Sequence, residues 1–224
     1  WLHDYYLRAG FDEVAGTAQE DNYGREGFNC DPLIVHAAFE ETFTFPRPDG
    51  VSPVINLGEN RRSGSRRDAS VDFTVVAHEW GHYLIGRLVG GVADEDALGN
   101  VQGLALHEAI ADFNGLLMTL SEGDDLRGAF AIGAYDNQDY LERRPTLPAS
   151  EAPADAMYFG IRRYPYSLDP TKNPLTFRHI AVAPPIDRPY FNWKGRGPVL
   201  YEVHTAGEVL ATAAFQCFGR IAAA

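Results

Sequence analysis

The chain has 224 residues, of which 45% are hydrophobic, a composition typical of a globular protein with a substantial core. Its formal net charge of −12 at pH 7 argues against binding to nucleic acid or to an anionic membrane surface. No hydrophobic run approaches the length of a membrane-spanning helix. We therefore predict a globular protein with neither nucleic acid nor membrane among its partners.

Residues 1–60 mix aromatic-rich segments with turn sequences, which predicts a helix and short strands. The segment Ser52–Leu57 is expected to be an edge strand, and the basic stretch 59–68 a solvated loop. Cys30 and Cys217 are the only cysteines, and the sequence leaves open whether they pair. Neither lies in a metal-binding pattern.

A long, largely buried helix is predicted over residues 70–89. Ser70 or Asp68 is expected to cap its start, and Gly90–Gly91 to end it. The apolar positions recur at helical spacing, at Val71, Val75, Val76, Leu84, Ile85 and Leu88.

This helix contains the run HEWGH, in which His78 and His82 lie one turn apart on the same face. Each can offer a neutral imidazole nitrogen to one zinc ion. Glu79 follows the first histidine and can reach a water molecule at that ion as a general base. The spacing therefore predicts two metal ligands and one base on a rigid element.

The next helical segment, residues 101–120, is also strongly apolar and contains Glu108 and Asp112, again four residues apart. We predict Glu108 as the third zinc ligand and Asp112 as the carboxylate that fixes the tautomer of a ligand imidazole. His107 competes for the ligand role. Adjacent helical residues point about 100° apart, so both cannot face the metal.

Residues 121–200 are rich in Gly, Pro and Asp, and helical stretches are expected near 126–133 and 151–163. A last helix is expected to begin near residue 203 and carries His204. Taken alone, a histidine at a helix start is more often a cap or a satisfied buried residue than a catalytic group.

HEWGH, GRLVGG (86–91) and HEAIADF (107–113) together resemble the gluzincin zinc peptidases, which have a thermolysin-like active site. Residues 1–32, 47–57, 162–180 and 199–215 narrow the resemblance to the fungalysin family of secreted zinc metallopeptidases. Two departures stand out. Tyr83 follows HEWGH where the family usually has glycine, and HEAIAD replaces the more typical GEGWSD. Both leave the ligands intact but raise a question about the shape of the pocket.

The resemblance implies an α+β, thermolysin-like zincin fold, mainly helical around the zinc site with a small N-terminal β region. We expect one catalytic domain over residues 1–224, partial at both ends, with approximate lobes 1–90 and 91–224. The resemblance also implies zinc on His78, His82 and Glu108, Glu79 as base, and Asp112 behind a ligand. It further implies that His204 lies near the oxyanion that forms from the substrate carbonyl during hydrolysis.

The expected function is a zinc-dependent, secreted endopeptidase that hydrolyses internal peptide bonds of extracellular proteins through a metal-activated water. Its partners would be protein or peptide substrates, with a propeptide in the parent protein. One Zn²⁺ per chain is expected, and no residue is predicted to bind another cofactor. Such enzymes can carry calcium, but no loop has the required spacing of oxygen ligands.

Two alternatives stay open at this point. A non-catalytic, zinc-stabilised binding or structural module would need a closed site of four ligands, completed by His107 or His204. A deformylase-type hydrolase would need a cysteine ligand, and neither cysteine has suitable surroundings.

Overall fold

The computed structural model describes residues 1–60, 66–90, 97–136, 157–180 and 203–222. It has the predicted α+β architecture, mainly helical with one small sheet. The strands are β1 (Ile34–Phe39), β2 (Phe43–Phe45), β3 (Val54–Asn60) and β4 (Arg67–Asp68). The longer helices are α1 (Leu2–Arg8), α2 (Phe73–Gly90), α3 (Val101–Leu117) and α5 (Val203–Ala222). Short 3₁₀ helices cover Ala69–Val71 and Phe177–His179.

Strand β3 lies in the interior of the sheet. It pairs in parallel with β1 and antiparallel with β2, in the order β1-β3-β2, and its end pairs with β4. The expectation that Ser52–Leu57 forms an edge strand is therefore wrong, because both of its sides carry partners. Strand β2 lies at the edge among the described residues. The ends of the basic stretch 59–68 also form strands, while residues 61–65 lie outside the described part.

Helix α2 confirms the predicted zinc-motif helix, but its first turn is capped by a different residue. The carboxylate of Asp72 accepts hydrogen bonds from the backbone NH and the hydroxyl of Thr74, at 3.1 Å and 2.6 Å. Asp68, one of the two expected caps, instead accepts from Ser70 NH and caps the preceding 3₁₀ helix. The helix ends at Gly90, where the sequence predicted its end.

Helices α3 and α5 also begin where they were predicted. The expected helix over residues 126–133 is absent: that segment forms turns and pairs at Phe130 with Tyr166. Of the expected helix over 151–163, residues 151–156 lie outside the described part and only 157–159 are helical. Cys30 and Cys217 are both exposed and free.

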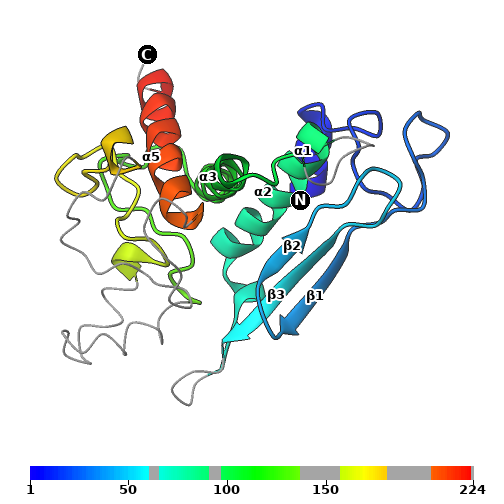
Figure 1. Ribbon diagram of the computed structural model, residues 1–224, viewed down its shortest axis with the longest axis horizontal. Coiled ribbons are helices and arrows are strands. Elements are labelled where there is room, and N and C mark those ends of the chain that lie inside the picture. The colour runs from blue at the N-terminus through cyan, green and yellow to red at the C-terminus, as the bar shows by residue number, and fades with distance from the viewer. Residues whose placement is uncertain (61–65, 91–96, 137–156, 181–202, 223–224) are drawn as a thin grey trace.

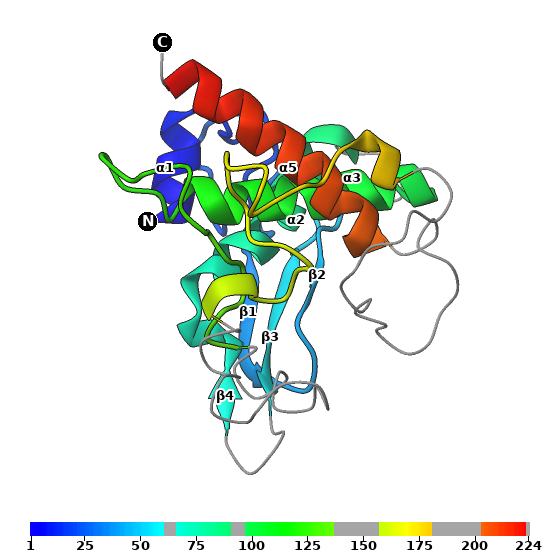
Figure 2. The ribbon, with the colours of Figure 1, turned by 90° about the vertical axis from the view of Figure 1, so that its left-hand side faces the viewer.

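Helices α2 and α3 lie between the sheet and α5, so the zinc-motif helix lies near the middle of the molecule (Figure 1, Figure 2). One hydrophobic cluster joins α1, β3 and α2 and contains Leu2, Phe11, Ala18, Ile55, Leu57, Ala69, Val75, Trp80 and Tyr83. A second joins α3 to α5 and contains Ala109, Leu116, Ile132, Tyr166, Ala211 and Phe215. The candidate site residues therefore lie on helices that are held by a core on each side.

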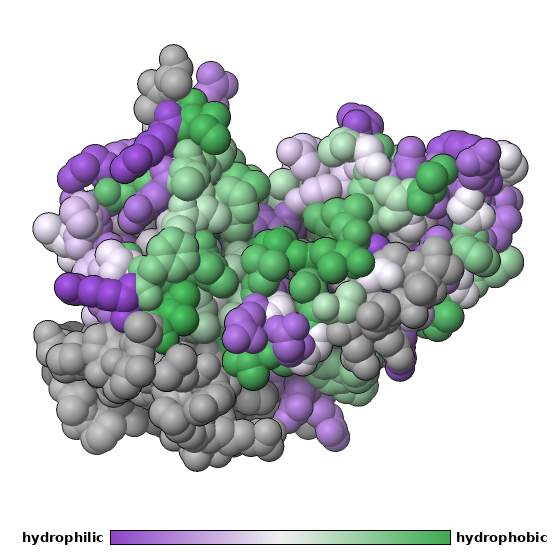
Figure 3. All heavy atoms as spheres, turned by 45° about the horizontal axis from the view of Figure 1, so that its top comes forward, coloured by the Kyte–Doolittle hydropathy of each residue, from purple (hydrophilic) through white to green (hydrophobic). Residues whose placement is uncertain are grey.

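Hydrophobic side chains gather across the middle of one face of the molecule, with hydrophilic side chains mostly toward the edges (Figure 3). Among the described helices, none combines the length and the apolar character that crossing a bilayer requires.

Candidate metal and active site

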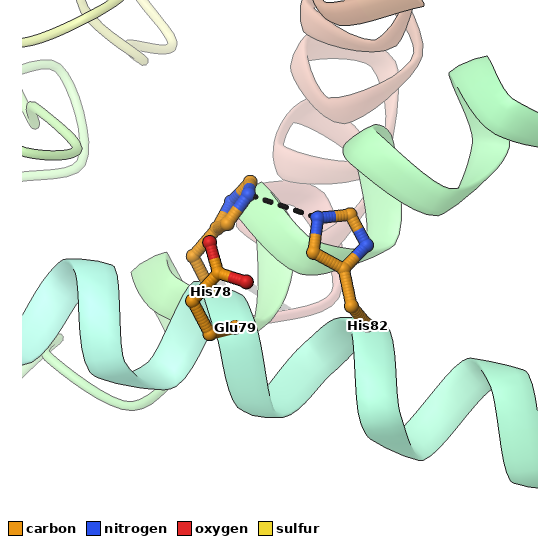
Figure 4. A group of neighbouring side chains, drawn as sticks. All are labelled: His78, Glu79 and His82. Carbon is orange, nitrogen blue, oxygen red and sulfur yellow. Dashed lines mark hydrogen bonds between the residues drawn. The ribbon is translucent and has the colours of Figure 1, made fainter. Parts of the chain in front are cut away.

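The three polar residues of HEWGH project from one side of α2 (Figure 4). The Nε2 atoms of His78 and His82 face each other at 3.1 Å. A ligand atom from each of His78, Glu79 and His82 fits within a group whose members are at most 4.8 Å apart. His78 and Glu79 are buried, and His82 is largely buried. The spacing of one helical turn has therefore produced the convergence that the sequence predicted.

Glu108 on α3 faces the same two imidazoles. Its Oε2 lies 3.6 Å from His78 Nε2, and its Oε1 lies 3.6 Å from His82 Nε2. Gly81 makes this close packing of α2 and α3 possible. A Cβ at Gly81 would lie 2.7 Å from the Cα of Ala111, closer than real Cβ contacts come. The glycine inside HEWGH thus allows the third predicted ligand to reach the first two.

Asp112, one turn after Glu108, holds His78 from behind. Its Oδ1 lies 2.8 Å from His78 Nδ1, on the side of the ring away from His82. Arg162 donates to both Asp112 oxygens, at 2.5 Å and 2.6 Å, and the hydroxyl of Tyr166 donates to Oδ2. The carboxylate is therefore fixed by three partners, and its position fixes the His78 ring.

Glu79 is oriented by strand β2. The hydroxyl of Thr44 donates to Glu79 Oε2 at 2.7 Å and also lies 3.1 Å from the Glu79 backbone carbonyl. This contact places β2, an edge strand of the sheet, directly beside the carboxylate predicted to be the base. Only one of the two carboxylate oxygens is engaged by Thr44.

His204 reaches the site from the first turn of α5. Its Nε2 lies 3.3 Å from Glu108 Oε1, and 45% of its side chain is exposed. Gly207, one turn later, allows α5 to approach α3, since a Cβ there would lie 2.5 Å from the Cβ of Glu108 and 2.9 Å from the carbonyl oxygen of Ala105. The structure thus brings His204 to the same group of side chains as the predicted ligands.

His107 lies behind His82. The Nδ1 atoms of the two rings are 3.1 Å apart, and their planes are tilted by 34°. His107 therefore contacts the nitrogen of His82 that faces away from His78 and Glu108. Of the two candidates for the third ligand, Glu108 is the one that approaches both Nε2 atoms.

Burial and neighbouring charges lower the pKa values of some side chains in the site and raise those of others. Burial lowers the pKa of His82 to about 3, which keeps its imidazole neutral. Burial raises the pKa of Glu79. For Glu108 burial favours the neutral acid, but His204, His82, His78 and Arg162 outweigh it and lower the pKa.

Asp112 and His78 are shifted together. Burial opposes charge on Asp112, but Arg162 and the hydrogen bonds from His78 and Arg162 hold its pKa well below the usual range. For His78 burial favours the neutral ring, and the adjacent Asp112 carboxylate outweighs it and raises the pKa. Asp112 is therefore the fixed negative charge behind this imidazole.

These residues fit a zinc ion. Within the described part of the chain, Oε2 of Glu108 is buried without a hydrogen bond, which is costly for a carboxylate oxygen unless something else satisfies it. Two imidazole nitrogens and this carboxylate converge on one region, and His, His and Glu are a donor set that catalytic zinc uses. His78 and Glu108 are buried, whereas His204 is partly exposed, so the group is open to solvent where His204 lies.

Tyr83, the departure beside HEWGH, does not enter the site. It is almost completely buried in the cluster with Phe11 and Trp80, and its hydroxyl accepts a hydrogen bond from Ala18 NH at 2.6 Å. Its side chain is thus held in the core by the N-terminal segment and adds nothing to the group formed by His78 and His82.

Sequence reasoning assigned no role to three residues of this site: Thr44, Arg162 and Tyr166. Arg162 and Tyr166 fall in the segment 162–180 that supported the family resemblance, and that resemblance was the only available signal. Thr44 carried no signal, because its place beside Glu79 depends on the sheet packing against α2.

The profile of the family described as "Fungalysin metallopeptidase (M36)" matches residues 1–223. Among similar proteins, "Extracellular metalloproteinase mep" of Aspergillus terreus is 30% identical over 183 residues, covering 80% of this chain and 26% of that protein. "Extracellular metalloproteinase 1" of Arthroderma otae is 28% identical over 219 residues, covering 96% of this chain and 29% of that protein. "Probable extracellular metalloproteinase 1" of Arthroderma benhamiae is 29% identical over 180 residues, covering 78% of this chain and 25% of that protein.

The chain therefore spans roughly a quarter to three tenths of the length of these relatives. The family match covers almost every residue and includes the helices that carry the site. The chain belongs to the fungalysin metallopeptidase family.

Proposed function

We propose that this chain carries the active site of a secreted zinc endopeptidase that hydrolyses internal peptide bonds of extracellular proteins. The observation that carries the proposal is the convergence of His78 Nε2, His82 Nε2 and the Glu108 carboxylate, all within 3.6 Å of one another. Secretion and protein substrates are proposed from the relatives, which are named extracellular metalloproteinases.

His78, His82 and Glu108 would hold the zinc ion. When bound, zinc acts as a Lewis acid toward water and toward the scissile carbonyl. Asp112 accepts the Nδ1 hydrogen of His78, which directs the Nε2 lone pair of that ring into the site. The neutral state of His82 likewise leaves its Nε2 able to coordinate.

Glu79 is the proposed general base. It takes the proton of the attacking water as the oxygen bonds to the carbonyl carbon, and it gives a proton to the departing amine as the C–N bond breaks. The Thr44 hydroxyl engages Oε2, which leaves Oε1 for proton transfer. His204, the more exposed member of the site, would donate a hydrogen bond to the developing oxyanion.

The substrate backbone is proposed to pair with the edge strand β2. This strand is hydrogen-bonded to β3 on one side, and Thr44 in its middle contacts the proposed base. An extended peptide added along the other side would pass beside Glu79. The segment Ser52–Leu57, which the sequence suggested as an edge strand, lies between β1 and β2 and so offers no free side for such pairing.

The test is casein cleavage by the zinc-loaded protein, by the protein after chelation, and after zinc is restored, with zinc content measured in parallel. Glu79→Gln should keep zinc but lose at least about 10²-fold in turnover, since a positioned base contributes about 10²–10⁴-fold. His78→Ala should lose the metal. Glu122→Gln makes the same change at an exposed position and should behave as wild type.

Near-normal turnover by Glu79→Gln would exclude this residue as the base. Zinc binding without cleavage by any form would favour the alternative, a zinc-stabilised module without catalysis.

A further inference from the structure

The two nitrogens of His82 have different partners. Nε2 faces the proposed zinc position, 3.1 Å from His78 Nε2 and 3.6 Å from Glu108 Oε1. Nδ1, on the other side of the ring, lies 3.1 Å from Nδ1 of His107. This second distance is within hydrogen-bonding range.

A contact between two Nδ1 atoms at this distance requires that one carries a hydrogen and the other a lone pair. A neutral imidazole that coordinates through Nε2 carries its hydrogen on Nδ1. His82 must then be the donor, and His107 the acceptor with its own hydrogen on Nε2. Metal-ligating histidines generally donate their other N–H to such a partner, which fixes the ring and raises its basicity as a ligand.

We propose that His107 is the positioning residue of His82, accepting its Nδ1–H and aiming Nε2 at the metal. The inference rests on the proposed function, in which His82 binds zinc through Nε2. It assigns each ligand histidine its own support from α3: a carboxylate, Asp112, behind His78, and a neutral imidazole, His107, behind His82.

Asp112 and His107 differ in their burial and in their charge. Asp112 is itself held by Arg162 and Tyr166 and is fully buried. His107 is only partly buried and carries no charge in its neutral form. His82 is therefore held by a weaker, neutral hydrogen bond than His78.

The geometry also separates this role from that of a ligand. His107 precedes Glu108 on the same helix, so their side chains leave α3 about 100° apart. Glu108 reaches the Nε2 side of His82, and His107 reaches the Nδ1 side. A single ion that binds His82 through Nε2 therefore has Glu108, and not His107, next to it.

The experiment compares zinc affinity, by competition with a chromophoric chelator, for wild type, His107→Ala, His107→Asn and His82→Ala. Alanine at 107 removes the acceptor and should weaken zinc binding by about 10–100-fold. Asparagine can place its Oδ1 where the histidine has Nδ1, so its affinity should lie closer to wild type than to the alanine variant. His82→Ala removes a ligand and should bind weakest.

His3→Ala is the matched control, because it replaces a partly exposed histidine on α1. This variant should bind zinc as wild type does. Circular dichroism of each zinc-free variant checks that the helices are intact. In the zinc-loaded wild type, long-range ¹H–¹⁵N spectra should show His107 as the Nε2–H tautomer and His82 with its hydrogen on Nδ1.

Unchanged affinity in a folded His107→Ala protein would overturn this inference and leave the proposed function standing. Affinity in His107→Asn as low as in His82→Ala would identify His107 as a ligand and overturn it too, as would an Nδ1–H tautomer of His107. If wild type itself fails to bind zinc, the proposed function fails first, so the two failures are distinguishable.

Discussion

At the scale of single residues, Asp112 has two roles at once, because it holds the His78 ring and also pairs with Arg162. It is fully buried, accepts from His78, and neutralises Arg162 through two hydrogen bonds. Removing its charge would leave the buried guanidinium of Arg162 with only the 3.5 Å contact to Glu108 as an ion pair among the described residues.

We therefore expect Asp112→Asn to destabilise the protein by about 3–5 kcal/mol, the cost of breaking a buried ion pair by removing one partner. Zinc affinity should fall by about 10–100-fold at the same time, because the His78 ring loses its carboxylate partner. Urea denaturation of the zinc-free protein measures the first effect, and chelator competition the second.

Tyr166→Phe serves as the comparison for Asp112→Asn, since it removes one hydrogen bond to the same carboxylate and leaves the charge. A larger stability loss in Tyr166→Phe than in Asp112→Asn would contradict the electrostatic account.

At the scale of elements, α3 is the helix on which the site depends, because it packs against both α2 and α5. Gly81 lets α3 approach α2, and Gly207 lets α5 approach α3 at Glu108. The close approach at Gly207 is made against backbone and Cβ atoms, which cannot turn aside as the end of a long side chain can.

Gly207→Ala should therefore cost about 1–3 kcal/mol in unfolding free energy, as overpacking in a close-packed interior does. It should also lower kcat/KM, because α5 carries His204 and must move away from Glu108 to admit the new methyl group. Urea denaturation and casein kinetics measure the two effects.

Gly219→Ala makes the same change near the other end of α5, where the three atoms nearest to the added Cβ belong to the side chain of Leu168. It should leave kcat/KM unchanged. Equal kinetic losses in both variants would show that α5 responds as a whole and not at its contact with Glu108.

At the scale of the whole molecule, Arg87 near the end of α2 joins the motif helix to the loops of the N-terminal part. Its fully buried guanidinium pairs with Asp31 and Asp49, each at 2.9 Å. It also donates to the backbone carbonyls of Gly16, Pro46 and Val51. One side chain thus satisfies oxygens from segments far apart in the sequence.

Arg87→Met would leave two buried carboxylates without their cation, and we expect it to cost about 3–5 kcal/mol. Arg127→Met removes an exposed arginine paired with Asp169 at 3.1 Å and should cost at most about 1 kcal/mol. Urea denaturation of both variants makes the comparison, and similar losses would contradict it.

Three tyrosines, Tyr83 and Tyr166 buried and Tyr6 partly buried, limit the stability of the protein at alkaline pH. Burial raises the pKa of Tyr6 to about 12 and also raises the pKa values of Tyr83 and Tyr166. In the unfolded chain these groups ionise near pH 10. Between pH 10 and 12 the native state therefore holds protons that the unfolded state has released, so stability is complete below pH 10 and falls above it.

We expect the urea midpoint to decline as the pH rises above about 10, and to decline less steeply in Tyr6→Phe than in wild type. The variant also loses its hydrogen bond to Asn114, which lowers stability at every pH and leaves the slope as the informative quantity. Identical slopes would show that Tyr6 ionises equally in both states.

The amino-acid pattern by itself determined the three long helices, the two histidines on one helical face and the family. Helical periodicity and a spacing of one turn are local properties, so they can be inferred without knowing what packs against them. Glu108 and Asp112 followed from the same logic, applied to a second apolar helix.

Only the tertiary structure decided which atoms meet. In segment 126–133, Phe130 pairs with Tyr166 and no helix forms. Segment Ser52–Leu57 is interior, because β1 and β2 pair with β3 on its two sides. The places of Thr44 beside Glu79 and of His107 behind His82 depend on how separate elements pack. Such contacts join residues distant in sequence, and no local pattern encodes the distance between them.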